Sequence, residues 1–169
     1  MKKVAILLAG MFDENEFIYP QYRLKEDFEV HIIAHEADKE YKGKSEVTKK
    51  STHAAKDVKA DDYAGVVIPG GYSPDGMRAS EDLKAFVKAM DEQKKPIAAI
   101  CHAGWMLASC CDIEGKTVTS TPTIQDDLKN AGAKWVDEAL AVDGHIITAR
   151  KPDDLPGFIK EFVRQVNGE

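Results

Sequence analysis

Short apolar runs alternate with segments of helical periodicity along this chain, and that alternation constrains its fold more than any other feature. Residues 4–9, 65–69 and 96–100 are almost continuously apolar, as is typical of parallel strands covered on both faces. Residues 29–34 predict a further strand. Because helices that join parallel strands make right-handed crossovers, the pattern predicts an α/β fold: a doubly wound, mostly parallel sheet with helices on both faces.

Four segments have the periodicity of helices: residues 16–26, the residues that follow Ser80, residues 124–131 and residues 155–166. Pro20 fits the first helix only in its opening turn or at a kink, because proline has no N–H to donate. The Ser80 side chain is suited to cap the second helix, and that of Asp153 or Asp154 the last one.

The remaining segments predict peripheral structure within one domain. Residues 38–60 are polar and rich in lysine, which predicts short edge strands or a hairpin. Asp143-Gly144 predicts a tight hairpin turn. A chain of 169 residues, 43% hydrophobic and 31% charged, has the size and composition of a single ordered domain spanning residues 1–169.

The charge balance and the apolar runs exclude several classes of partner. With 29 acidic and 23 basic residues the net charge is -6, so the protein repels polyanions and we expect no nucleic acid partner. No apolar run approaches the roughly 18 residues of a membrane-spanning helix, and we expect no membrane partner. No export signal is apparent, and the three cysteines suggest no disulfide framework, so we expect a cytoplasmic location.

Side chains suited to chemistry follow three of the predicted strands. Glu16 comes after the first, Gly70, Gly71 and Asp75 after the third, and Cys101 and His102 directly after the fourth. Ligands of open parallel sheets bind at the carboxyl ends of the strands, so we expect these residues to meet in one cleft.

Cys101 lies where a strand passes sharply into a helix, the usual place for an exposed nucleophile. The positive end of that helix is expected to lower the pKa of the thiol and favour the thiolate. His102 can accept the proton if the turn brings the two side chains together rather than splaying them apart. The alternative is that Cys101 is only a small buried apolar side chain.

Glu16 can approach Cys101 across neighbouring strand ends, and burial is then expected to raise its pKa. The alternative is that Glu16 merely solvates a loop and favours a helix N-terminus. The N–H groups of Gly71 and His102 can form an oxyanion hole, although two consecutive glycines are more often only a tight turn. Cys110, Cys111 and the histidines lack ligand spacing, so we expect no metal and no cofactor.

The sequence resembles the PfpI-type intracellular protease family of the ThiJ/PfpI superfamily, which includes the parkinsonism-associated deglycase. Five motifs carry the resemblance, in order along nearly the whole chain: residues 16–20, 68–75, 99–104, 126–132 and 152–155. It implies a flavodoxin-like fold related to class I glutamine amidotransferase domains. The glutaminase site of those domains needs His-x-Glu, whereas the residue two positions after His145 is Ile147. The sequence therefore does not predict a glutaminase site.

The resemblance also implies roles for individual residues. Cys101 is the nucleophile, Glu16 is the carboxyl partner of its sulfur, and His102 is the base. Asp75 reaches His102 from a neighbouring subunit, which implies a homo-oligomer, either a dimer or a hexamer built from dimers. Gly70 and Gly71 line the substrate and oxyanion site together with Thr121, which stands where many protease-type members have a tyrosine.

The resemblance implies a stress-protective enzyme that acts through a Cys101 thiolate on small carbonyl compounds or on glycated or unfolded peptides. Its activity is that of a glutathione-independent glyoxalase or protein deglycase, or of a peptidase or amidase. One alternative is a redox sensor or chaperone in which Cys101 is oxidised to sulfinate. A third reading is a non-catalytic oligomeric scaffold. The family usually has Gly-Pro after this histidine, whereas here Ala103-Gly104 follows His102 and precedes Trp105.

Overall fold

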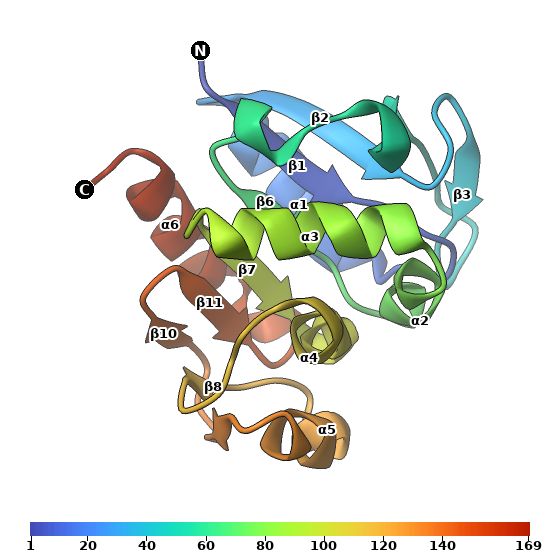
Figure 1. The fold of residues 1–169 in the computed structure, drawn as a ribbon. Helices are drawn as coiled ribbons and strands as arrows, with labels where there is room; N and C mark the ends of the chain where they lie inside the picture. Colours follow the sequence, from blue (N-terminus) through green and yellow to red (C-terminus); the bar gives the residue numbers. More distant parts are fainter.

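A seven-stranded sheet runs through the middle of the computed structural model, which describes residues 1–169 (Figure 1). In spatial order its strands are β10 (Ala141–Asp143), β11 (Ile146–Ala149), β7 (Ile97–Ile100), β6 (Val66–Ile68), β1 (Lys3–Leu7), β2 (Glu29–Ala34) and β5 (His53–Ala54). All neighbours pair in parallel except β10 and β11, which form an antiparallel hairpin. The predicted doubly wound, mostly parallel sheet is confirmed.

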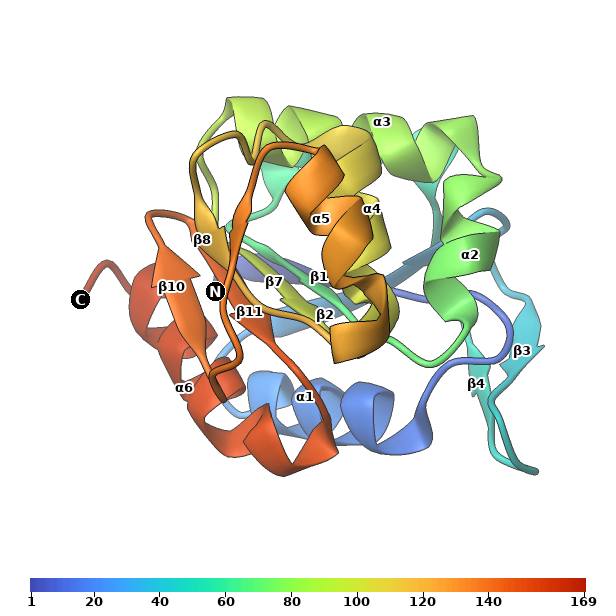
Figure 2. The same ribbon diagram turned by 90° about the horizontal axis from the view of Figure 1, so that it is seen from below.

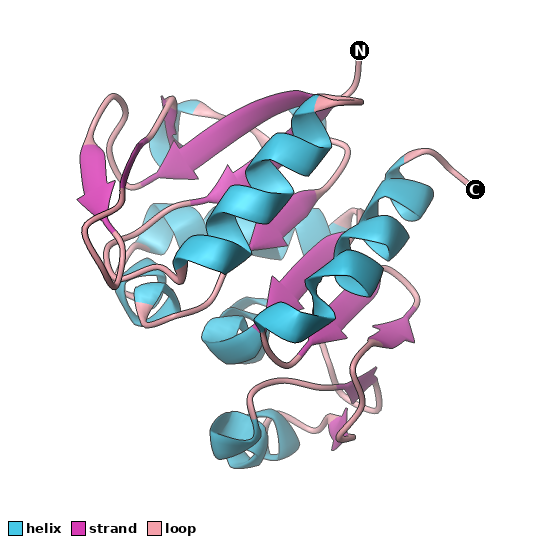
Figure 3. Ribbon diagram, turned by 180° about the vertical axis from the view of Figure 1, so that it is seen from behind, coloured by secondary structure: helices cyan, strands magenta, loops and turns pink.

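Helices cover both faces of the sheet (Figure 2). The helices α1 (Glu14–Lys25) and α6 (Leu155–Val166) lie side by side on one face, as Figure 3 shows from behind. The other face carries α2 (Ser73–Arg78), α3 (Glu81–Glu92) and α4 (Gly104–Cys110), with α5 (Gln125–Asn130) packed on α4.

The two layers of helices explain why the central strands are apolar without interruption. Successive side chains of a strand point to opposite faces. Val4 and Ile6 of β1 therefore belong to the core under α1 and α6, whereas Ala5 and Leu7 belong to the core under α3 and α4. Either face left open would have placed polar residues at every second position.

Small elements surround the sheet. The predicted hairpin within residues 38–60 is present as β3 (Glu40–Lys42) and β4 (Thr48–Lys50), and β5 pairs at the sheet edge. β8 (Thr117–Val118) and β9 (Lys134–Trp135) form a separate parallel pair. Short 3-10 turns occur at Ala55–Asp57, Ala60–Asp62, Cys101–Ala103, Pro122–Ile124 and Pro152–Asp154. None of the helices has both the length and the apolar character that crossing a membrane requires.

The capping predictions had different outcomes. The Ser80 side chain accepts a hydrogen bond from the Leu83 N–H, which confirms it as the cap of α3. Asp154 precedes α6, but its buried carboxylate binds the guanidinium of Arg150 instead of a helix N–H, with Nε at 3.0 Å. Neither Asp154 nor the exposed Asp153 caps α6, so that prediction is wrong: a charged partner attracts the carboxylate more strongly.

Two helical details differ from the sequence prediction. The short helix α2 was not predicted, because Pro74 and Gly76 make the segment read as a loop. Pro20 lies beyond the first turn of α1, so the alternative that places it in the opening turn is wrong. Its missing N–H leaves the Glu16 carbonyl without the usual helical donor.

A buried pair ties the β10–β11 turn to the end of α3. The Nε2 atom of His145 lies 2.7 Å from Oδ1 of Asp91, and both side chains are less than a tenth exposed. The second oxygen of Asp91 accepts the N–H of Asp112 at 2.9 Å. One carboxylate therefore satisfies a buried imidazole and a backbone N–H from two other segments.

Replacing Asp91 with alanine is expected to lower the free energy of unfolding by about 2 to 4 kcal/mol, because two polar groups lose their partner. Urea unfolding followed by circular dichroism measures the change. Glu92→Ala, at an exposed neighbouring position of α3, is the matched control and is expected to change stability by less than about 0.5 kcal/mol. Equal effects of the two substitutions would contradict the role of the buried pair.

Candidate active site

Three loops meet at the carboxyl edge of the sheet, as the sequence predicts. The loop after β1 runs beside the glycines after β6: the Asp13 N–H donates to the Gly70 carbonyl at 3.3 Å, and Phe12 forms an isolated antiparallel bridge with Gly71. The next strand, β7, ends directly before Cys101. The loops after β1, β6 and β7 therefore surround one point.

Cys101 occupies a strained turn between β7 and α4. Its φ angle is 62, in the left-handed region that side chains other than glycine rarely adopt. Such a conformation costs roughly 1 to 2 kcal/mol and persists only where the surrounding structure enforces it. The thiol is half-buried, so the reading of Cys101 as a fully buried apolar side chain does not describe it.

Glu16 lies beside this thiol with no exposed surface. Its Oε1 accepts the Gly70 N–H at 2.8 Å, whereas Oε2 is buried without a hydrogen-bond partner. Burial, and then the charge of Asp13, raise the pKa of Glu16 to about 8. Glu16 therefore holds its proton at neutral pH, which confirms the predicted direction and makes its carboxyl a donor next to the sulfur.

The two glycines after β6 make this contact sterically possible. A Cβ atom on Gly70 would lie 2.5 Å from Oε1 of Glu16 and 2.8 Å from Cβ of Cys101. Gly71 has a φ of +72, and its Cβ would lie 2.5 Å from the backbone N of Asp13. Any side chain at Gly70 would separate the acid from the thiol.

The pKa of Cys101 is raised to about 11, chiefly by burial and then by the charge that Glu16 carries when ionised. The backbone N–H groups of Gly71 and His102 lower the pKa of the thiol and so act in the opposite direction. The prediction of a lowered pKa is therefore wrong: desolvation outweighs these amides and the dipole of a helix of only seven residues. In the resting site, the N–H groups predicted to form the oxyanion hole therefore favour the ionised form of the sulfur.

His102 meets Cys101 although the two residues are adjacent in sequence. Its Nδ1 atom lies 3.4 Å from Sγ of Cys101. Burial, and then the positive charge of Lys44, lower the pKa of His102, so the imidazole is neutral at pH 7. With its proton on Nε2, the ring presents an acceptor to the thiol.

Two predicted residues lie at the margin of this cluster. Asp75 is exposed on α2 and makes no hydrogen bond with His102 within the chain. Thr121 is half-buried and approaches through its backbone, whose N–H donates to the Cys101 carbonyl at 3.2 Å.

Lys44 is a nearby cation that the sequence analysis missed. Its Nζ lies 3.1 Å from Oδ2 of Asp13, and its backbone N–H donates to the Phe12 carbonyl at the same distance. It comes from the turn of the β3–β4 hairpin, far from the sulfur in sequence. No pattern in that lysine-rich segment distinguishes Lys44 from its neighbours.

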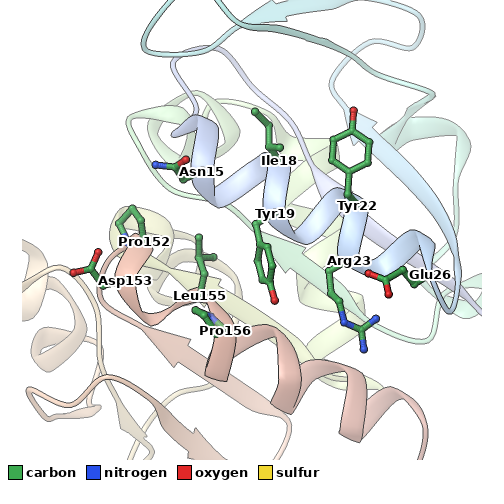
Figure 4. Close-up of a pocket in the computed structure, with 10 residues that line it drawn as sticks. All are labelled: Asn15, Ile18, Tyr19, Tyr22, Arg23, Glu26, Pro152, Asp153, Leu155 and Pro156. Carbon is green, nitrogen blue, oxygen red and sulfur yellow. The ribbon is translucent and has the colours of Figure 1, made fainter.

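The groove shown in Figure 4 is separate from the cysteine. It has a volume of about 640 Å³ and lies between α1 and the start of α6, with Tyr19 pointing from α1 toward α6. Neither Cys101 nor His102 lines it. No group of three or more His, Cys, Asp or Glu side chains is placed to hold a metal ion.

The raised pKa of Glu16 predicts a specific pH dependence of stability. Between about pH 4.5 and 8 the unfolded chain has lost this proton and the folded chain still holds it, so the contribution of Glu16 to stability falls as pH rises. Glu16→Gln removes the titration and keeps an amide that can donate and accept. From pH 5 to 8 the free energy of unfolding of the wild type is expected to fall by roughly 3 to 5 kcal/mol relative to that of the variant. Urea unfolding at each pH measures both values. Parallel pH profiles would contradict a buried, protonated Glu16.

Comparisons with known proteins agree with the geometry. The model of the DJ-1/PfpI family matches residues 2–165. Deglycase TK1284 of Thermococcus kodakarensis is 40% identical over 163 residues, covering 96% of this chain and 98% of that protein. YraA of Bacillus subtilis, whose name provisionally assigns it to the cysteine proteases, is 40% identical over 161 residues, 95% of each chain.

A solved structure with the same fold is a two-domain protein of Anabaena variabilis that contains DJ-1/ThiJ/PfpI-like and ferritin-like domains. It is 37% identical with a TM-score of 0.96, and the match covers 99% of this chain and 48% of that one. DJ-1beta of Drosophila melanogaster is 26% identical with a TM-score of 0.91, over 99% and 91% of the two chains. The resemblance inferred from the sequence is confirmed: this chain belongs to the DJ-1/PfpI family.

Proposed function

We propose that the protein is a cysteine-dependent enzyme that converts small carbonyl compounds or removes them from glycated protein groups. The observation that carries the proposal is the 3.4 Å approach of the Cys101 sulfur to the Nδ1 atom of a neutral His102. A thiol with a raised pKa needs such a base at the moment of attack. The name of the Thermococcus relative, a deglycase, supports the substrate class.

The first step joins the sulfur to the aldehyde carbon of a substrate such as methylglyoxal. The thiol proton passes to Nδ1 of His102 while the carbonyl electron pair moves to oxygen, which then takes a proton to give a hemithioacetal. We assign the donation of that proton to the Glu16 carboxyl beside the sulfur, which is protonated at neutral pH. The Gly71 and His102 N–H groups stabilise negative charge beside the sulfur throughout.

The adduct then rearranges without an external oxidant. A proton leaves the former aldehyde carbon and another is added to the neighbouring ketone carbon, so the first carbon is oxidised and the second reduced. The product is a lactoyl thioester of Cys101, which water hydrolyses to lactate and the free thiol. Each of these proton transfers needs a general acid or base, and we assign these roles to His102 and Glu16.

The same cysteine can form an acyl-enzyme with a peptide, which releases an amine before water hydrolyses the thioester. The half-burial of Cys101 favours small carbonyl compounds, or glycated and unfolded peptides, over folded protein substrates. A stress-protective role follows, because such an enzyme removes reactive carbonyl groups before they accumulate on proteins.

The raised pKa of Cys101 favours the enzyme over a redox sensor. Peroxide oxidises the thiolate, and a thiol with a pKa of about 11 is protonated almost entirely at neutral pH. An enzyme with an adjacent neutral histidine needs no resting thiolate. Intact mass measurement after mild peroxide treatment separates the two: stoichiometric Cys101 sulfinate would favour the sensor.

Cys101→Ser is expected to reduce the conversion of methylglyoxal to lactate by roughly 100-fold or more, because a serine hydroxyl is a far weaker nucleophile. Enzymatic measurement of lactate and loss of methylglyoxal report the same reaction. Cys111→Ser makes the same change at a half-buried cysteine outside the site and is expected to retain activity. Equal turnover by Cys101→Ser and the wild type would exclude the proposed function.

We also propose that the chain forms a homo-oligomer in which Asp75 of one copy faces His102 of another. Its exposed position on α2 and its lack of contact with His102 within the chain support this arrangement. Asp75→Asn is expected to lower kcat/KM about 10-fold by removing the carboxylate that orients the base. Asp82→Asn, an exposed aspartate at the start of α3, is the matched control.

Mixing Asp75→Asn with Cys101→Ser tests the arrangement directly. Mixed oligomers contain one site with both an intact cysteine and an intact aspartate, so activity is expected to return when the two variants are refolded together. Light scattering gives the oligomer size. A monomeric chain, or mixed oligomers without restored activity, would contradict the shared site.

A further inference from the structure

Two aromatic side chains lie against the imidazole of His102. The rings of Trp105 and His102 meet edge to face, with centroids 5.1 Å apart and an interplanar angle of 62°. The Tyr72 ring is 5.9 Å away and tilted by 41°. Trp105 is half-buried at the start of α4, whereas Tyr72 is 59% exposed in the loop before α2. Trp105 is therefore the closer and less exposed neighbour.

Trp105 is itself held from two directions. Its Nε1–H donates to Oδ2 of Asp127 in α5 at 2.8 Å. The guanidinium of Arg78 in α2 lies over the indole, 5.7 Å from the ring centroid. Contacts from α5 and α2 therefore hold the indole of Trp105, which belongs to α4.

Within its own chain, His102 has no hydrogen-bond partner of the kind that commonly orients a catalytic imidazole. Its one hydrogen bond within the chain is the contact of Nδ1 with the Cys101 sulfur. In many Cys-His and Ser-His sites a carboxylate or amide binds the second nitrogen and fixes the ring. Here the orientation of the ring within the chain depends on packing, and Trp105 supplies the nearest aromatic contact.

We propose that Trp105 is a positioning residue that holds the His102 imidazole with Nδ1 directed at the Cys101 thiol. The inference rests on the proposed function for its catalytic consequence, but the geometry it describes exists without turnover. Trp105 touches neither the sulfur nor the reacting carbonyl in this scheme and acts through His102.

Trp105 also shields the imidazole from water. The pKa of His102 is lowered chiefly by burial. Removing the indole is therefore expected to hydrate the ring, return its pKa toward the ordinary value and allow it to rotate away from the sulfur. Asp127 and Arg78 lose their contact with the indole in this variant, although Arg78 keeps its hydrogen bond to Ser109. Asp13 and Lys44, which pair with each other, do not depend on the indole.

The first test needs no substrate. In a Trp135→Phe background Trp105 is the single tryptophan, and its fluorescence is expected to fall when the adjacent imidazole becomes protonated. We expect a titration midpoint below 6.5, absent when His102→Gln is added. Fluorescence without a His102-dependent step would show that the two rings do not remain in contact and would overturn the inference.

The second test measures the reactivity of Cys101 and also needs no turnover. Trp105→Ala is expected to slow alkylation by iodoacetamide at pH 7 about 5- to 10-fold, because the base is misplaced. Trp105→Phe keeps an aromatic ring and is expected to stay within about 3-fold of the wild type. Circular dichroism and urea unfolding verify that both variants fold. Unchanged alkylation in a folded Trp105→Ala would overturn the inference, whatever the substrate is.

Kinetics with methylglyoxal separate positioning from substrate binding. Trp105→Ala is expected to lower kcat roughly 10- to 100-fold, to leave KM within about 3-fold, and to move the acidic limb of the kcat/KM profile to higher pH. A raised KM with unchanged kcat would identify Trp105 as a wall of the binding site and overturn the positioning role. Failure of the proposed function is distinct, because the wild type itself would then not turn over methylglyoxal.

Discussion

The approach of the buried Glu16 carboxyl to the half-buried Cys101 thiol governs the organisation of the candidate site. Glu16 has no exposed surface, and the Gly70 N–H satisfies only one of its oxygens. Burial keeps the carboxyl, which lies beside Cys101, protonated at neutral pH. The sheet edge, the two glycines and the start of α1 all have geometries that this contact requires.

The double-sided sheet supplies the rigidity that the contact needs. The strands β1, β6 and β7 are completely buried between two cores along most of their length, so their carboxyl ends cannot shift independently. Glu16, Gly70 and Cys101 each follow one of these strands. A left-handed backbone at Cys101 and an uncharged glutamate are both unfavourable in isolation, and the packed layers on either side maintain them.

Much of this arrangement is predictable from sequence because it follows from apolar periodicity. Continuous apolar runs fixed the central strands, and the order of strand ends brought Glu16, Gly71 and Cys101 together. The predictions that were wrong or missing depended on distances and burial, which the sequence does not contain. The pKa of Cys101 follows from its depth and its distance to Glu16, Asp154 binds Arg150 in place of its helix, and Lys44 arrives from a hairpin with no distinguishing pattern.

The left-handed backbone at Cys101 has a consequence for the evolution of this domain as well as for its chemistry. At a φ of 62 glycine would be relaxed, whereas the native side chain carries a strain of roughly 1 to 2 kcal/mol. Because the strain comes from the Cβ atom, a duplicated copy no longer selected for reactivity would gain stability by replacing this cysteine with glycine. Glycine or asparagine at this turn is therefore expected to distinguish paralogues that have lost the activity from those that retain it.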